Sequence, residues 1–179
     1  MANEIIARFG PLEFINNGST HPVGGSVSSR GISPTGNGAG LAFPTGVDRS
    51  VYAGMRIPNA AALATGITAE LAFALPPGVI SVGKNAVFGI TIGPITSATT
   101  TFDENASTGA LVSCTEVLAT VTLSPSPIIV TASFAIAIAK MNSLAAGGHA
   151  LVKVRRNGTS ASDTLNAPAV LLWADFRNT

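Results

Sequence analysis

The stretch "IIVTASFAIAIAK", residues 128–140, indicates the fold class of this chain. Phe134, Ile136 and Ile138 are each followed by an alanine, so the large side chains would lie on one face and the small ones on the other. A period of two is typical of β-strands, whereas a helix places its apolar residues three and four positions apart. The stretch therefore predicts a strand that buries its large face and offers its alanine face to a close neighbour.

Further strand-like segments lie on either side of this one. They are residues 67–75 ("ITAELAFAL"), 86–92 ("AVFGITI"), 111–123 ("LVSCTEVLATVTL") and 149–158 ("HALVKVRRNG"), and Gly, Pro and Asn turns separate them. No amphipathic helix intervenes, and such a series predicts an all-β fold, an antiparallel β-sandwich of the jelly-roll type.

Residues 1–50 have a different composition, with 9 of the 19 glycines and four of the 11 prolines. Most of this segment has no strand or helix periodicity with which to bury itself. We therefore predict an extended, irregular N-terminal arm at residues 1–50, lying along a sister subunit or a larger surface. The jelly-roll domain would occupy residues 51–179.

The charge content of the chain is low. Charged residues make up 11% of the sequence, against about 25% in an average soluble domain. A chain that covers part of its surface with other subunits needs fewer charges, so this composition favours obligate assembly. The net charge of +1 predicts no direct binding of nucleic acid or of an anionic membrane, and no apolar segment reaches the roughly 18 residues of a membrane span.

The one cluster of cations, Lys153, Arg155 and Arg156, lies at the end of the segment 149–158. Alternation places Arg156 on the face of the two valines and Arg155 on the opposite face. The turn dipeptide Asn-Gly follows, and Asp163 comes a few residues later. We predict a structural ion pair within this loop between Asp163 and either Arg155 or Arg156, rather than a site for a polyanion.

The sequence contains no recognisable metal, cofactor or catalytic constellation. The two histidines, His21 and His149, lie far apart in sequence, and "FDENAS" (102–107) lacks the ligand spacing of a calcium loop. The single cysteine, Cys114, is expected to be a small buried residue of a strand, with a thiol pKa raised by nearby Glu116. We therefore expect no enzyme, no metal and no cofactor.

Three acids and two aromatic residues bear on carbohydrate chemistry. Glu70, Glu116 and Asp175 are scattered along the chain, and the sequence does not pair them. Sugar sites commonly place an aromatic ring beside convergent polar groups. Tyr52 stands alone, and Trp173 lies within "VLLWADF", where we expect it to pack in the core.

The C-terminal part of the chain resembles small virion proteins of tailed bacteriophages. The resemblance covers roughly residues 51–177, and its matching positions are Tyr52, Gly54, Gly148, Val152, Val154, Arg155, Arg156, Asp163, Thr164, Leu165, Leu171 and Leu172. The family's aromatic-rich middle is replaced here by "FGITIGPIT", residues 88–96.

The resemblance implies a jelly-roll trimer on the virion, made in the host cytoplasm. It leads us to expect a capsid cement or decoration protein that binds between capsomers. Its partners would be two further copies of itself and, through the arm, the major capsid protein or another virion protein. The alternative is a receptor- or glycan-binding module of a fibre or tail.

Overall fold

The computed structural model describes residues 5–10, 40–58, 63, 66–76, 79, 83–96, 110–111, 113–123 and 129–178. Within these ranges the chain forms nine strands and one short 3₁₀ helix. They are β1 (Ile5–Phe9), β2 (Leu41–Phe43), β3 (Asp48–Arg56), β4 (Gly66–Ala74), β5 (Lys84–Ile95), β6 (Val117–Leu123), β7 (Val130–Ala137), η3 (Ile138–Lys140), β8 (His149–Asn157) and β9 (Ala169–Asn178).

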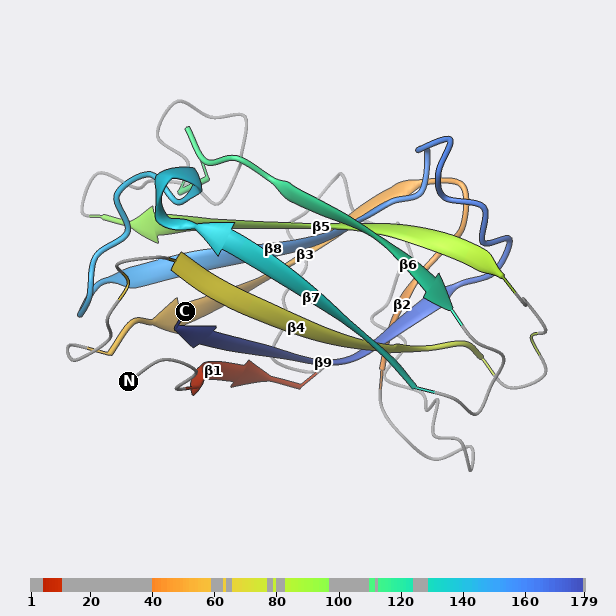
Figure 1. Ribbon diagram of the computed structural model, residues 1–179, viewed down its shortest axis with the longest axis horizontal. Helices are drawn as coiled ribbons and strands as arrows, with labels where there is room; N and C mark the ends of the chain where they lie inside the picture. Colours follow the sequence, from red (N-terminus) through yellow and green to blue (C-terminus); the bar gives the residue numbers. More distant parts are fainter. Residues whose placement is uncertain are drawn as a thin grey trace.

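The strands form two antiparallel sheets that pack face to face (Figure 1). The first sheet, which we call sheet A, has the order β1-β9-β4-β7, with β2 also paired to β9. The second, sheet B, has the order β3-β8-β5-β6. Except for the β5–β6 hairpin, each successive strand from β2 onward crosses to the other sheet. This is the jelly-roll arrangement, and the predicted fold class is confirmed.

The core lies between the sheets and is filled by the inward faces of the strands. On β4, Ile67, Ala69, Leu71 and Phe73 are fully buried, as their alternation predicts. The ring of Phe73 stacks on that of Phe88 from β5, with centroids 4.0 Å apart, so an aromatic pair joins the two sheets.

Strand β7 confirms the alternation of the opening stretch over part of its length. Phe134 and Ile136 are buried and the alanines at 135 and 137 are exposed. The strand ends at Ala137, however, and Ile138–Lys140 turns into η3. The alternation therefore stops earlier than the sequence suggests.

The predicted strand at 111–123 is too long. Only Val117–Leu123 is a strand, and Ser113 has a φ of 64°. This left-handed conformation is incompatible with an extended strand, so the chain turns before β6 begins. No helix in the described part of the chain is long and apolar enough to cross a membrane.

The two ends of the predicted arm belong to the sandwich. β1 pairs with the C-terminal half of β9 and β2 with its N-terminal half (Figure 1). Gly40 permits the close approach of β2, because a Cβ there would lie 2.3 Å from Cγ1 of Val170. Residues 5–9 and 40–50 are thus not an irregular arm, and residues 11–39 lie outside the described residues.

Candidate functional site

A β-bulge in β9 turns Trp173 to the outer face of sheet A. Ala72 is opposite Trp173, but the next residue, Phe73, is opposite Leu171, so Leu172 is the extra residue. A bulge reverses the inward–outward phase of the strand beyond it. Leu171 therefore points into the core, and so do Ala174 and Phe176, while Trp173 points outward and is half-buried. Our expectation of a core tryptophan is wrong for this reason.

Four charged side chains from three neighbouring strands surround this tryptophan. Arg8 from β1 and Glu70 from β4 are both opposite Asp175 of β9 in the strand register, and Arg177 follows on the same face of β9. Together with Trp173 these residues line an open pocket of about 540 Å³. Pockets of roughly 300–1,000 Å³ are typical of small-ligand sites.

Asp175 is the electrostatic centre of the pocket. Arg8 donates two parallel hydrogen bonds to it, from Nε to Oδ1 at 2.6 Å and from Nη2 to Oδ2 at 2.7 Å. These bonds lower the pKa of Asp175 against the opposing effect of burial, and they raise the pKa of Arg8. Asp175 is therefore ionised at neutral pH, which makes it a poor proton donor but a firm anchor for Arg8.

Arg177 is held less tightly. Its Nη2 lies 3.5 Å from Oδ2 of Asp175 and 3.7 Å from Oε2 of Glu70, distances longer than a good hydrogen bond. Its Nε is buried and has no hydrogen-bond partner among the described residues. The carboxylates of the pocket thus hold the guanidinium of Arg177 less firmly than that of Arg8.

The pocket combines an outward-facing, half-buried indole ring with hydrogen-bond donors and acceptors. An indole offers a flat apolar face, guanidinium groups only donate, and carboxylates only accept. This combination suits recognition of a ligand that has an apolar face and many hydroxyl groups.

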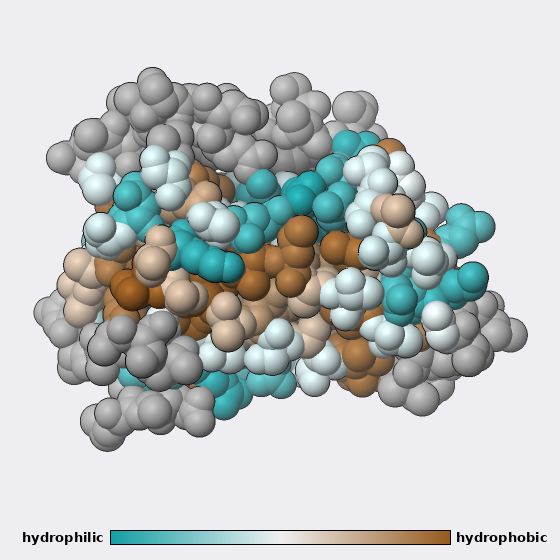
Figure 2. Space-filling view, turned by 45° about the horizontal axis from the view of Figure 1, so that its top comes forward, coloured by the Kyte–Doolittle hydropathy of each residue, from teal (hydrophilic) through white to brown (hydrophobic). Residues whose placement is uncertain are grey.

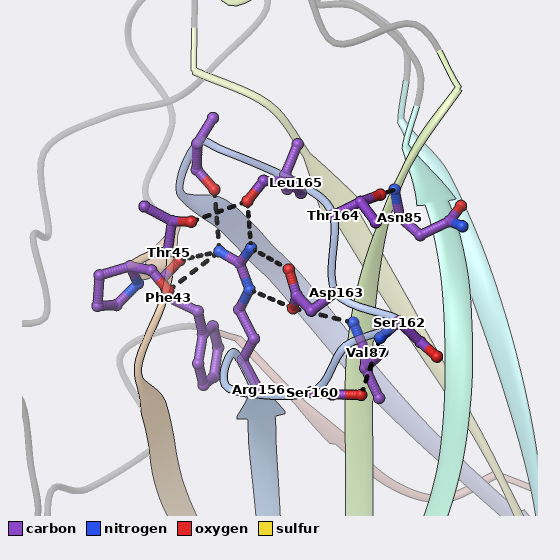
Figure 3. Close-up of polar contacts among 12 residues, drawn as sticks. Phe43, Thr45, Asn85, Val87, Arg156, Ser160, Ser162, Asp163, Thr164 and Leu165 are labelled. Atoms are coloured by element: carbon purple, nitrogen blue, oxygen red, sulfur yellow. Dashed lines mark hydrogen bonds and ion pairs between the residues drawn. The ribbon is translucent and has the colours of Figure 1, made fainter.

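The predicted ion pair exists, and Arg156 rather than Arg155 makes it. Arg156 Nε and Nη2 donate to the two carboxylate oxygens of Asp163 at 2.9 and 2.7 Å, with both side chains almost completely buried. Arg156 also donates to main-chain carbonyl groups of four residues: Phe43, Pro44, Leu165 and Ala167 (Figure 3).

The loop after β8 is thereby fastened to the neighbouring strands. Asp163 accepts a further hydrogen bond from the main-chain N–H of Val87 in β5. Thr164 Oγ1 accepts one from the main-chain N–H of Asn85 (Figure 3). A buried arginine whose donors are used in this way has a structural role and is not available to a ligand.

Arg155 lies on the other face of sheet B and pairs with two different acids. Its guanidinium donates to Glu116, with Nε 2.8 Å from Oε1, and to Asp48, with Nη1 2.8 Å from Oδ2. Glu116 reaches Arg155 across Gly89, where a Cβ would lie 2.5 Å from the carboxylate. Arg155 and Arg156 are therefore structural, one on each face of the strand.

The remaining residues considered from sequence do not gather into a reactive site. Cys114 lies in the turn before β6, with Sγ 3.9 Å from the carbonyl oxygen of Ala110. Burial, rather than Glu116, raises the pKa of its thiol, which disfavours the nucleophilic thiolate. Tyr52 is buried against Leu151.

Within the described ranges, no group of three or more His, Cys, Asp or Glu residues could hold a metal ion. His21 and the segment 102–107 lie outside those ranges. Of the three scattered acids, the fold brings Glu70 and Asp175 together and leaves Glu116 on the other sheet.

The sequence did not predict this pocket, because its residues are distant from one another in the chain. The pattern of residues 169–176, "AVLLWADF", also gives no sign of the β-bulge. One signal was present. Asp175 and Arg177 lie two and four residues after Trp173, and the apolar residues Ala174 and Phe176 alternate with them. This spacing alone indicates that Trp173 shares a face with charged residues.

No family model matches the chain, and no curated protein matches it. Among solved structures, an isomaltodextranase of Arthrobacter globiformis T6 complexed with panose aligns at a TM-score of 0.39 and 16% identity, over 76% of this chain and 17% of that one. TmCBM61 in complex with β-1,4-galactotriose aligns at a TM-score of 0.34 and 6% identity, over 78% of this chain and 65% of that one.

A xylan-binding domain, CBM22-1 of Paenibacillus barcinonensis Xyn10C, aligns at a TM-score of 0.37 and 12% identity, over 98% of this chain and 95% of that one. This chain thus spans less than two thirds of the first two proteins. With every TM-score below 0.5, these likenesses identify no shared ligand.

Proposed function

We propose that this chain is a glycan-binding jelly-roll module whose ligand lies on Trp173. The observation that carries the proposal is the outward indole of Trp173 beside Arg8, Glu70, Asp175 and Arg177 in one open pocket. A sugar ring would stack on the indole while its hydroxyl groups bond to the flanking guanidinium and carboxylate groups. The module acts by binding alone, and no bond of the ligand is broken.

The single tryptophan of the chain provides a direct assay. A glycan that stacks on Trp173 should change its fluorescence, so a screen of immobilised glycans followed by fluorescence titration tests the proposal. The substitution Trp173→Ala should weaken binding by about 30-fold or more, since loss of a central tryptophan commonly costs about 2 kcal/mol or more. Because this variant has no tryptophan, its affinity is measured by calorimetry, alongside the wild type.

Leu118→Ala is the matched control. Leu118 is a large apolar residue that faces outward, as Trp173 does, but it is 51% exposed and lies on β6 of sheet B. This variant should bind as the wild type does. The proposal is wrong if no glycan binds, or if Trp173→Ala binds as tightly as Leu118→Ala.

A structural role in a virion is the second candidate, and one observation favours it. Strands β6 and β7 contain no charged residue. Leu118 within β6 is 51% exposed, and Ile129, directly before β7, is 39% exposed. Figure 2 shows a band of hydrophobic surface along the middle of one side of the molecule. Contiguous apolar surface of this kind is common at protein interfaces.

The solution mass of the purified protein, measured by light scattering, tests the second candidate. A mass of three times 18.0 kDa, together with attachment to undecorated phage heads, would support a trimeric capsid cement protein. A monomer that attaches to no particle would contradict it. Glycan binding by a trimer would fit a fibre or tail module.

A further inference from the structure

The charges at the Trp173 pocket point to the class of glycan that it takes. Two guanidinium groups, of Arg8 and Arg177, face two carboxylates, of Glu70 and Asp175, so the formal charge of the four groups is zero. The arrangement is not a cationic patch, although two of its members are arginines. A ligand bearing negative charge gains no net attraction from such a set.

Both arginines are already engaged by carboxylates. Arg8 is bidentate to Asp175, and Arg177 lies between Asp175 and Glu70. The carboxylate of an acidic sugar would have to displace Asp175 from the Nε–Nη2 edge of Arg8, or share an arginine with Asp175 or Glu70 through its remaining donors. Removing one partner from a paired carboxylate that is only 4% exposed is unfavourable.

Glu70 adds repulsion at the surface. Its side chain is 39% exposed, so a ligand over the pocket meets a carboxylate directly. Like charges a few ångströms apart repel strongly where water is partly excluded. Hydroxyl groups are compatible with every member of the set, because each hydroxyl both donates and accepts.

We infer that the Trp173 pocket selects neutral glycans and rejects glycans built from uronic or other acidic sugars. This inference rests on the proposed glycan-binding function. The guanidinium groups donate to sugar oxygens, the Glu70 carboxylate accepts from a sugar hydroxyl, and the same carboxylate excludes anionic sugars.

The test compares matched ligands on the intact protein. Neutral trisaccharides of glucose, galactose and mannose are titrated against the trisaccharides of the corresponding uronic acids, by Trp173 fluorescence and calorimetry at low and high ionic strength. We expect at least one neutral trisaccharide to bind about tenfold or more tightly than its uronic counterpart. Its affinity should change little with salt, because no net charge is neutralised.

The variant Glu70→Gln keeps the shape of the side chain and removes its charge. In this variant the ratio of the affinity for the neutral trisaccharide to that for its uronic counterpart should fall by about threefold or more, since the repulsion between Glu70 and the uronic carboxylate is lost. Glu116→Gln makes the same change on sheet B, where Glu116 pairs with Arg155, and should leave the preference unchanged.

The outcomes separate the two claims. Binding of a uronic trisaccharide as tightly as its neutral counterpart, weakened by salt, overturns the inference and leaves the proposed function standing. An unchanged preference in Glu70→Gln also overturns the inference. Binding of neither series overturns the proposed function and the inference together.

Discussion

The described part of the chain contains two bidentate arginine–aspartate pairs that differ in their surroundings. In Arg156–Asp163 the exposed fractions of the side chains are 0% and 1%, and in Arg8–Asp175 they are 62% and 4%. The first pair joins a loop to main-chain carbonyl groups from several segments. The second lines an open pocket beside a tryptophan.

This difference shows that the residue types of an ion pair do not reveal whether the pair stabilises the fold or lines a surface pocket. A buried pair with every donor used stabilises one conformation and has nothing left to offer a ligand. A pair with one exposed partner contributes less to folding, because water competes for its groups. The exposed pair is accordingly the one that lines the proposed binding site.

The largest effect should follow from Arg156→Ala. The substitution leaves Asp163 buried without its partner and removes the donor from the carbonyl groups that Arg156 contacts. We expect the free energy of unfolding to fall by about 3–5 kcal/mol, measured by urea denaturation. Arg156→Lys should recover only part of this loss, because lysine lacks the planar fork. A loss below about 1 kcal/mol would contradict the structural role.

Two aromatic residues of β9, Trp173 on its outer face and Phe176 on its inner face, should differ in how much they stabilise the fold. Phe176 is fully buried, so Phe176→Ala should lower the free energy of unfolding by about 3–5 kcal/mol. Trp173→Ala should lower it by about 1–2 kcal/mol, because the outward-facing indole buries a smaller fraction of its area than Phe176 does. Thermal and urea unfolding of both variants measure this. A larger loss for Trp173→Ala would mean that the bulge does not turn the indole outward.

The ionisation of Asp175 should make the free energy of unfolding depend on pH in a predictable way. Because the pKa of Asp175 is lowered in the folded state, chiefly by Arg8, its ionised form stabilises the fold above its ordinary pKa of 3.8. That contribution is lost as the pH falls below this value and through the lowered pKa. Urea unfolding of wild type and Asp175→Asn over a pH series should show a constant difference near neutral pH that shrinks in acid. A difference that grows in acid would contradict the assignment.

Arg8→Ala should have the smallest effect on folding. Its side chain is 62% exposed, and Arg177 stays 3.5 Å from Asp175 after the substitution, so Asp175 keeps a cationic neighbour. The free energy of unfolding should therefore fall less than in Arg156→Ala. The affinity for the proposed glycan ligand should fall as well, since Arg8 lines the pocket. An Arg8→Ala variant as unstable as Arg156→Ala would remove the distinction between the two pairs.

The sequence predicted well where alternation continued without interruption. The β4 and β8 segments placed the correct residues inward, including Arg156 beside the two valines. The neighbourhood of Asp163 was also predictable, because the Asn-Gly turn brings it back within a few residues. Which arginine pairs with Asp163 was not, since that depends on which face of β8 the returning loop covers.

Prediction failed where a local backbone irregularity changed the phase of a strand. The left-handed Ser113 ends the extended run before β6, and the extra residue Leu172 sends Trp173 outward. The glycine-rich composition of residues 1–50 predicted an irregular arm, but β1 and β2 within this segment become strands by pairing with β9. Edge strands of 5 and 3 residues are too short for a clear period.

By itself, the sequence determined the all-β class, most of the inward residues and the structural nature of the ion pair that Asp163 makes after β8. These follow from periodicity and turn chemistry, which are local. Only the tertiary structure decided the candidate site. Arg8, Glu70 and Trp173 come from three strands that are far apart in the chain, and they meet because β1 and β4 flank β9 in one sheet. Strand pairing is a long-range interaction, so no short window of sequence contains it.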